Sequence, residues 1–167
     1  RGLAPMATDR AIALGITGPV LRATGIPWDI RRAEPYGIYD RLNFDIPVGK
    51  QGDIFARYMV RLSEMYQSTK MLEQCLDQMP GGLVLKPDLP KTLRIEEAEA
   101  YFRYEGTKGE YGVYVMSKGG NKPYRMKLRS PSFCTLSALK EMVVGTWVAD
   151  AIIILGSLDI VLGEVDK

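Results

Sequence analysis

The chain has 167 residues, about the length of one domain, and its 46% hydrophobic and 25% charged residues are typical of a soluble globular protein. A net charge of +2, without a basic run interleaved with aromatic residues, argues against nucleic-acid binding. The absence of histidine excludes Ser-His-Asp and Cys-His catalysis, histidine-held zinc and histidine proton transfer.

The two cysteines, Cys75 and Cys134, lie far apart and form no CxxC pattern, which indicates a reducing compartment. No signal-peptide pattern is visible. Because the chain opens with Arg1-Gly2 rather than Met, we expect a fragment of a longer protein.

Residues 1–50 are rich in Gly and Pro and are predicted to be largely irregular. Thr8-Asp9 is predicted to cap a short helix over Arg10–Leu14, after which turn residues such as Thr17-Gly18-Pro19 interrupt any regular pattern. The segment mixes charged and aromatic side chains. It is either a surface layer held by ion pairs or an ordered wall of a cleft.

Residues 51–80 contain the clearest amphipathic helix, over positions 52–79. Asp53 suits its N-terminus, and Pro80-Gly81-Gly82 ends it. The methionines of the apolar face are predicted to fill the core. That face recurs at spacings of three and four through Phe55, Tyr58, Met59, Leu62, Met65, Leu72, Leu76 and Met79.

Residues 83–97 hold two prolines and are predicted to form a loop. Strand-like runs then follow at 98–105, 111–117 and 123–129, with turns at 106–109 and 118–121. The 98–130 segment is therefore predicted to be a three-stranded antiparallel meander. Its last strand carries Arg125, Lys127 and Arg129 on one face, either as a solvated row or as partners for an acidic tail.

Residues 135–167 are predicted to form the C-terminal helices and tail. Cys134-Thr135 is expected to cap a helix over Leu136–Val143. The run Val143–Leu155 is apolar on nearly every side and predicts a buried helix, since a membrane span needs about 20 apolar residues. Asp159 follows inside an apolar tail, where a carboxylate requires a partner.

The expected fold class is α+β, a single unit with helices packed around a small antiparallel three-stranded sheet and a buried C-terminal helix. The residues show no nucleophile paired with a base, no metal-ligand set, no phosphate loop and no dinucleotide fingerprint. The residue pattern alone therefore predicts an acidic, buried C-terminus beside basic loops, without a defined reaction.

From Gly15 to Lys167 the chain resembles the C-terminal part of the large quinone-binding (D, 49 kDa) subunit of respiratory complex I, NADH:quinone oxidoreductase. That large subunit is related to its counterpart in nickel–iron hydrogenases. The most specific match is the ending Gly156-Ser157-Leu158-Asp159-Ile160-Val161 followed by Gly163-Glu164-Val165-Asp166. Further matches are Thr17-Gly18-Pro19, Trp28-Asp29-Ile30-Arg31, Glu34-Pro35-Tyr36, Phe44–Gly49, Gly52-Asp53, Arg57-Tyr58, Gln67-Ser68, Lys108-Gly109-Glu110, Pro123-Tyr124-Arg125 and Arg129–Phe133.

Two positions depart from the related patterns. Hydrogenases carry metal-binding cysteines just after this aspartate, whereas Ile160–Glu164 contains none, so nickel–iron binding is not expected. The family tail usually ends in arginine, and here it ends in Lys167, which keeps the charge but loses the bidentate fork.

The resemblance implies that this chain forms part of a quinone-reduction chamber, where electrons pass from a partner subunit's iron–sulfur cluster to quinone. The chain itself would bind no cofactor, would meet NADH only through other subunits, and would lie peripherally on the cytoplasmic face of the bacterial inner membrane. By the resemblance, Lys108 would stabilise an anionic quinone oxygen and Asp159 would serve proton uptake. The implied quinone-site residues are Lys108, Gly109, Asp159, Val161, Arg129, Pro131 and Ser132.

The alternative is a non-catalytic structural or assembly module of a hydrogenase-like membrane complex. In that case Lys108 is an exposed turn residue, Asp159 is a structural ion-pair residue and Arg129 caps the terminal helix. By the resemblance, a histidine and a tyrosine for the quinone headgroup come from the family's N-terminal half, which does not match this chain, and the chain has no histidine of its own. We therefore expect the isolated chain to be inactive, with exposed apolar surface where its partners belong.

Overall fold

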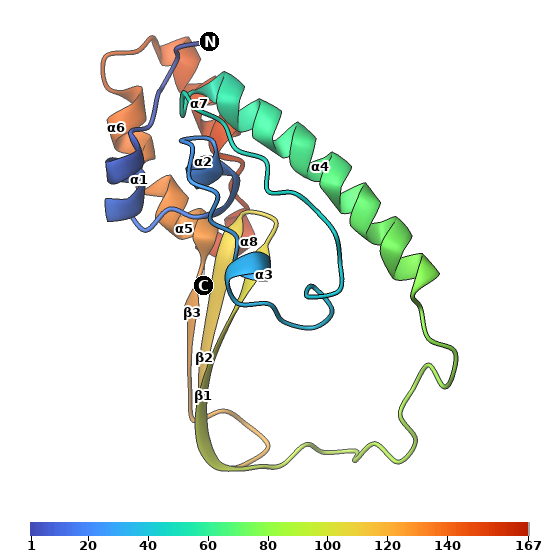
Figure 1. Ribbon diagram of the computed structural model, residues 1–167. Helices are drawn as coiled ribbons and strands as arrows, with labels where there is room; N and C mark the ends of the chain where they lie inside the picture. The colour runs from blue at the N-terminus through green and yellow to red at the C-terminus, as the bar shows by residue number, and fades with distance from the viewer. Residues whose placement is uncertain (167) are drawn as a thin grey trace.

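The computed structural model describes residues 1–166, and Lys167, which replaces the family's usual arginine, lies outside the described residues. Helices and a three-stranded sheet make an α+β fold, as the sequence predicts (Figure 1). The elements are α1 (Thr8–Ala13), α2 (Gly18–Arg22), α3 (Ile30–Ala33), α4 (Ile54–Asp77), β1 (Ile95–Gly106), β2 (Gly109–Gly120), β3 (Arg125–Arg129), α5 (Pro131–Leu136), α6 (Leu139–Val143), α7 (Val148–Leu158) and α8 (Leu162–Val165).

The sheet is an antiparallel meander in the order β1-β2-β3. β1 and β2 form a long hairpin whose last pair, Gly106 with Gly109, leaves Thr107 and Lys108 as the two turn residues. At the other end the ladder continues to Ile95 opposite Gly120, so much of the second predicted turn is strand. The meander is confirmed, and its first two strands are longer than the sequence pattern indicates.

The main hydrophobic core lies among the short helices rather than against the sheet. Buried residues from α1, α2, α6 and α7 form one cluster that includes Ala11, Val20, Met142 and Ile154. Figure 1 shows these helices gathered at one end of the molecule, with the long β1–β2 hairpin extending away from them. The turn of that hairpin, Thr107 and Lys108, lies at the helical end against α2, and the candidate site forms there. The other end of the hairpin extends away from the helices (Figure 1).

Helix α4 begins at the predicted place, because the Asp53 carboxylate accepts a hydrogen bond from the Ala56 N–H at 2.8 Å. Within residues 1–166, however, the predicted apolar face of α4 is exposed and joins no core cluster. Leu62 and Met65 are exposed, and Met71 is the methionine of this helix that is buried. The prediction that the apolar face fills the core is wrong, because the residues through which α4 joins core clusters are others, namely Ala56, Val60 and Met71.

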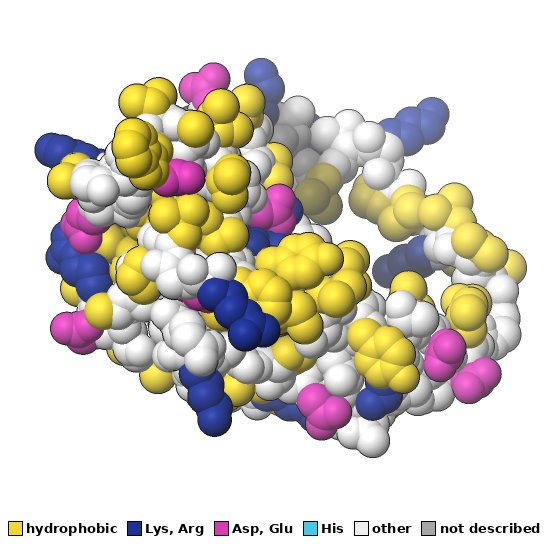
Figure 2. Space-filling model, turned by 90° about the horizontal axis from the view of Figure 1, so that it is seen from above, with side chains coloured by type: hydrophobic (Ala, Val, Ile, Leu, Met, Phe, Trp, Pro, Cys, Tyr) yellow, Lys and Arg dark blue, Asp and Glu magenta, His cyan; other side chains and the backbone are white. Residues whose placement is uncertain are grey.

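Helix α7 also departs from the prediction of a helix buried on all sides. Ile154 and Leu158 are buried, whereas Val148 and Ile152 are exposed. The cause is that α7 packs on α4 and α6 and places only one face in the main core cluster, through Ile154 and Leu158. Figure 2, which views the molecule from above, shows hydrophobic side chains over much of this end. Within residues 1–166, no helix has the length and hydropathy needed to cross a membrane.

Several helix starts differ from the prediction. In α1 the N-cap is Ala7, without a side-chain bond, so Thr8-Asp9 does not cap it. Gly18-Pro19 opens α2 instead of interrupting structure, because proline at the first turn needs no N–H partner. For the same reason Pro131 opens α5, whose cap is Ser130 and not Cys134-Thr135.

Candidate functional site

The hairpin tip that carries Lys108 is held against the backbone that precedes α2. Gly18 has a φ of +70°, and a Cβ built there would lie 2.5 Å from the Lys108 carbonyl oxygen. A Cβ on Gly109 would lie 2.6 Å from Thr17 Oγ1, which accepts a hydrogen bond from the Glu110 N–H at 2.9 Å. Both glycines are therefore needed for this close approach of two backbones.

Arg129 secures the same hairpin from the β3 side. Its guanidinium donates to the Glu110 carbonyl oxygen at 2.6 Å and to the Gly15 carbonyl oxygen at 2.7 Å. Arg129 thus joins the start of β2 to the segment before α2. Its hydrogen bonds go to backbone carbonyls. Arg129, one of the three cations of β3 that the sequence offers as partners for the acidic tail, is therefore not the partner of Asp159.

Buried charges fix the base of the Lys108 turn. The guanidinium of Arg22, 2% exposed, bonds Glu64 of α4 at 2.6 Å and Glu105 of β1 at 2.8 Å. Burial opposes its charge, but Glu64 and Glu105 outweigh that effect and raise the pKa of Arg22. Burial raises the pKa of Glu105 despite its contact with Arg22.

The charged N-terminal segment is therefore not simply a surface layer. Asp29 is 2% exposed and pairs with Arg31 at 2.6 Å. The Asp29 carboxylate also accepts from the Arg31 N–H, which starts α3. These buried pairs make the segment an ordered wall beside the hairpin.

Ser132 attaches the C-terminal tail to α5. Its hydroxyl donates to the Glu164 carboxylate at 2.6 Å and accepts from the Val161 N–H at 3.2 Å. Ser132 and Pro131 are both fully buried within the chain, so in this arrangement they support the tail and present no open surface. Val161 is 41% exposed and offers the apolar surface.

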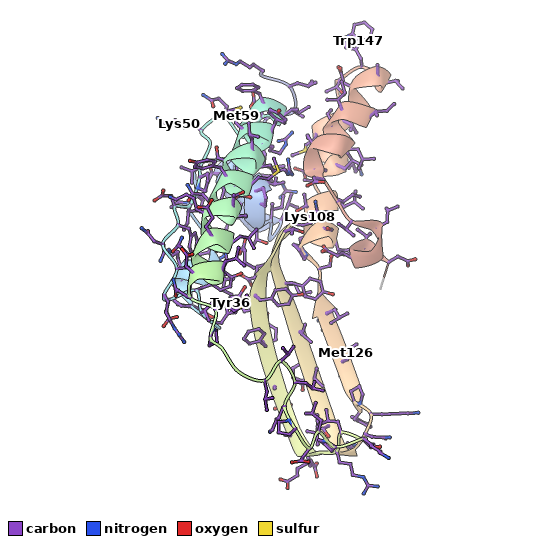
Figure 3. The ribbon with its side chains drawn as sticks, turned by 90° about the vertical axis from the view of Figure 1, so that its right-hand side faces the viewer. Tyr36, Lys50, Met59, Lys108, Met126 and Trp147 are labelled. Atoms are coloured by element: carbon purple, nitrogen blue, oxygen red, sulfur yellow. The ribbon has the colours of Figure 1, made fainter. Side chains whose placement is uncertain are left out.

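The Asp159 carboxylate and Lys108 meet directly. Asp159 ends α7 in the left-handed conformation, with φ at 55°, a conformation that aspartate tolerates better than most residues. Its Oδ2 accepts from Lys108 Nζ at 2.5 Å, and the Lys108 side chain is 19% exposed. In Figure 3 Lys108 lies at the tip of the sheet, between α4 and the C-terminal helices. Lys108 is therefore not a free turn residue.

An open groove of about 570 Å³ is lined by Asp159, the acidic member of this ion pair, whereas Lys108 does not line it. It runs between α4 and α7, and its charged lining residues are Arg61 and Asp159. The Arg61 Nε lies 3.3 Å from the same Asp159 Oδ2. The apolar walls include Tyr58, Leu62, Met65 and Ile153.

Arg57 and Arg61 are two site residues that the sequence pattern does not predict. Arg57 is fully buried, and its guanidinium donates to Ser157 Oγ at 3.0 Å and to the Gly52 carbonyl oxygen at 2.6 Å. Burial, with the nearby charge of Arg61, lowers the pKa of Arg57 to about 10. The sequence feature that could have predicted these two site residues is their spacing of four on an otherwise largely apolar stretch of helix. This spacing places both arginines on one face of α4.

The comparisons with known proteins point to one class, the subunits of NADH-quinone oxidoreductases. The family described as "Respiratory-chain NADH dehydrogenase, 49 Kd subunit" matches residues 1–94 and 88–167, and the chain belongs to this family.

Several bacterial proteins named as the D subunit of NADH-quinone oxidoreductase are similar to this chain. The chain is 50% identical to the protein of Dehalococcoides mccartyi over 167 residues, which are 100% of this chain and 45% of the relative. It is 44% identical to that of Albidiferax ferrireducens, over 99% of this chain and 46% of the relative. A D subunit from a Roseiflexus species is 49% identical, over 94% of this chain and 44% of the relative. The chain thus spans about half the length of the curated relatives it matches.

Proposed function

We propose that this chain forms one wall of the quinone-reduction chamber of an NADH:quinone oxidoreductase. The observation that carries the proposal is the 2.5 Å contact between Lys108 Nζ and Asp159 Oδ2. It brings the basic hairpin turn to the acidic end of α7, where Asp159 lines an apolar groove. Membership of the 49 kDa family supports the same assignment.

The chemistry required is the uptake of two electrons and two protons by a quinone, which becomes a quinol. The electrons arrive singly from an iron–sulfur cluster in a partner subunit, and they place negative charge on a ring oxygen. Lys108, held in a largely water-excluded position, stabilises that oxygen more strongly than water would. Asp159 holds the Lys108 ammonium in place and is the carboxyl group within reach for proton transfer.

The other predicted residues have supporting roles in this proposal. Val161 supplies exposed apolar surface for the ring. Gly109 allows the turn to approach α2, and Arg129 holds the start of β2. Pro131 and Ser132 fix the tail that carries Val161.

The partners follow from the same assignment. The exposed apolar faces of α4 and α7 are suited to contact with other proteins. The proposed partners are the N-terminal half of the family's D subunit and the iron–sulfur subunit beside the site. The proposed location is peripheral, on the cytoplasmic face of the bacterial inner membrane, with NADH bound by other subunits of the complex.

The test is quinone reduction by the assembled complex carrying Lys108→Met or Asp159→Asn. Removing a hydrogen-bond donor that stabilises the charge developing on a reacting oxygen lowers kcat by about 100-fold or more. Lys108→Met removes the donor and Asp159→Asn removes its acid–base partner, so each variant is expected to reduce quinone much more slowly. Lys122→Met, on the exposed β2–β3 connection, is the matched control. NADH oxidation by an artificial acceptor verifies that each complex is assembled and loaded.

Normal quinone reduction by both site variants would overturn the proposal. In that case the chain is the alternative, a structural or assembly module. Purification of the complex through this chain also distinguishes the quinone-chamber function from the structural module. If the chain is a structural module, we expect its partners to be recovered without the iron–sulfur protein.

A further inference from the structure

Two cations contact the Asp159 carboxylate that lines the groove. Lys108 Nζ and Arg61 Nε lie 2.5 Å and 3.3 Å from the same oxygen of Asp159. One carboxylate oxygen therefore faces two cations that come from different elements, the hairpin turn and α4. Arg57, one turn earlier on α4, adds a third positive charge close to Arg61.

Arg61 is bound at one end and unused at the other. Its Nη2 donates to the Leu158 carbonyl oxygen at 3.2 Å, at the end of α7. Its Nε is buried and has no hydrogen-bond partner among residues 1–166, although it lies within ion-pair distance of Asp159. A buried donor without an acceptor costs free energy, so Arg61 gains if Asp159 turns toward it.

We infer that Arg61 is a positioning residue of the quinone site, which takes over the Asp159 carboxylate when Lys108 releases it. The inference rests on the proposed function. The Lys108 ammonium has further donors, but the paired Asp159 carboxylate offsets its charge, so Lys108 stabilises an anionic quinone oxygen more strongly once Asp159 is released. Release without a substitute would leave a half-buried carboxylate unpaired, which is costly. Arg61 Nε already lies near the same oxygen, so a small rotation of Asp159 completes the exchange.

The geometry of α4 makes this exchange specific to Arg61. Arg57 is held by Ser157, Ala4 and Gly52, so its donors are already in use. Arg61 makes one hydrogen bond in the described chain and retains a free donor that faces the carboxylate. The two arginines therefore differ in role, although they lie on the same face of α4.

The experiment is a double-mutant cycle in the assembled complex, with quinone reduction as the activity. Arg61→Gln is expected to lower kcat about tenfold with little change in KM, because the exchange is needed only as charge develops on the quinone. Arg61→Lys keeps a cation near Asp159 and is expected to restore most of the rate. Arg125→Gln, at an exposed position on β3, is the matched control.

The cycle separates positioning from a purely structural role. In the Asp159→Asn background there is no carboxylate to receive, so Arg61→Gln is expected to change kcat less than about twofold. A structural role through the Leu158 carbonyl would persist in that background. An undiminished effect of Arg61→Gln there would overturn the inference, as would wild-type kcat in the single variant.

Failure of the inference is distinguishable from failure of the proposed function. If Lys108→Met and Asp159→Asn slow quinone reduction but Arg61→Gln does not, only the role of Arg61 is wrong. If the Lys108 and Asp159 variants reduce quinone normally, the proposed function itself is wrong. NADH oxidation by an artificial acceptor, equal in all variants, excludes loss of assembly as the cause of any decrease.

Discussion

Gly18→Ala is expected to detach the Lys108 turn from the segment that supports it. Gly18 has a φ of +70°, and the added Cβ would lie 2.5 Å from both the Lys108 carbonyl oxygen and the Gly109 Cα. These are backbone atoms of a tight turn, and they cannot rotate away as a side chain does. The hairpin tip must therefore move, and Lys108 moves with it.

The magnitude follows from two separable costs. Alanine in the left-handed region costs about 1–2 kcal/mol, and forcing an extra methyl into a packed contact costs about 1–3 kcal/mol. Gly119 isolates the first cost, because its φ is +80° and a Cβ there meets nothing within 4 Å. The contact itself should therefore be worth ~2 kcal/mol, or ~30-fold in a local opening equilibrium.

Hydrogen exchange followed by mass spectrometry measures this opening in the assembled complex. Amides of residues 106–112 should exchange ~30-fold faster in Gly18→Ala than in Gly119→Ala. In Gly119→Ala, faster exchange should be confined to residues near that substitution. Equal exchange of residues 106–112 in the two variants would refute the argument that Gly18 fixes the turn.

Two other predictions concern α4 and the isolated chain. Asp53→Ala should cost about 1 kcal/mol of stability. The N–H groups of Gly2 and Ala56 lower the pKa of Asp53 below 3.8, so its contribution is complete above that value and is lost as pH falls through the folded-state pKa. Urea unfolding at neutral and strongly acidic pH, with Asp77→Ala as control, tests this, and an equal loss at both pH values would contradict it. The isolated chain should show no tight, saturable quinone binding by tryptophan fluorescence, because its groove is open; a Kd of about 1 μM or below would disprove this.

The sequence was sufficient for the elements whose signals are local. Apolar spacing and Asp53 located α4, and Gly106 and Gly109 around two residues located the hairpin turn. The sequence pattern gave a wrong prediction where one residue pair is typical both of a turn and of a helix start. Gly18-Pro19 was interpreted as a break, yet proline at the first helical turn is favourable, and the same rule explains the start of α5 at Pro131.

Burial was the property that local pattern did not predict. The apolar residues of α4 and α7 were assigned to a core, but Leu62 and Ile152 are exposed. Meanwhile Arg57, polar by composition, is fully buried because Ser157 and two backbone carbonyls satisfy its guanidinium. An apolar stripe shows that a face will be covered, without showing which chain covers it.

By itself the sequence determined the α+β fold class, the family and the expectation that Asp159 needs a partner. Only the tertiary structure decided that the partner is Lys108 and that Arg129 is occupied with backbone carbonyls. It also brought Arg61 to the same carboxylate from a helix far earlier in the chain. The physical reason is that ion-pair choice depends on distances of a few ångströms, which packing sets and sequence spacing does not.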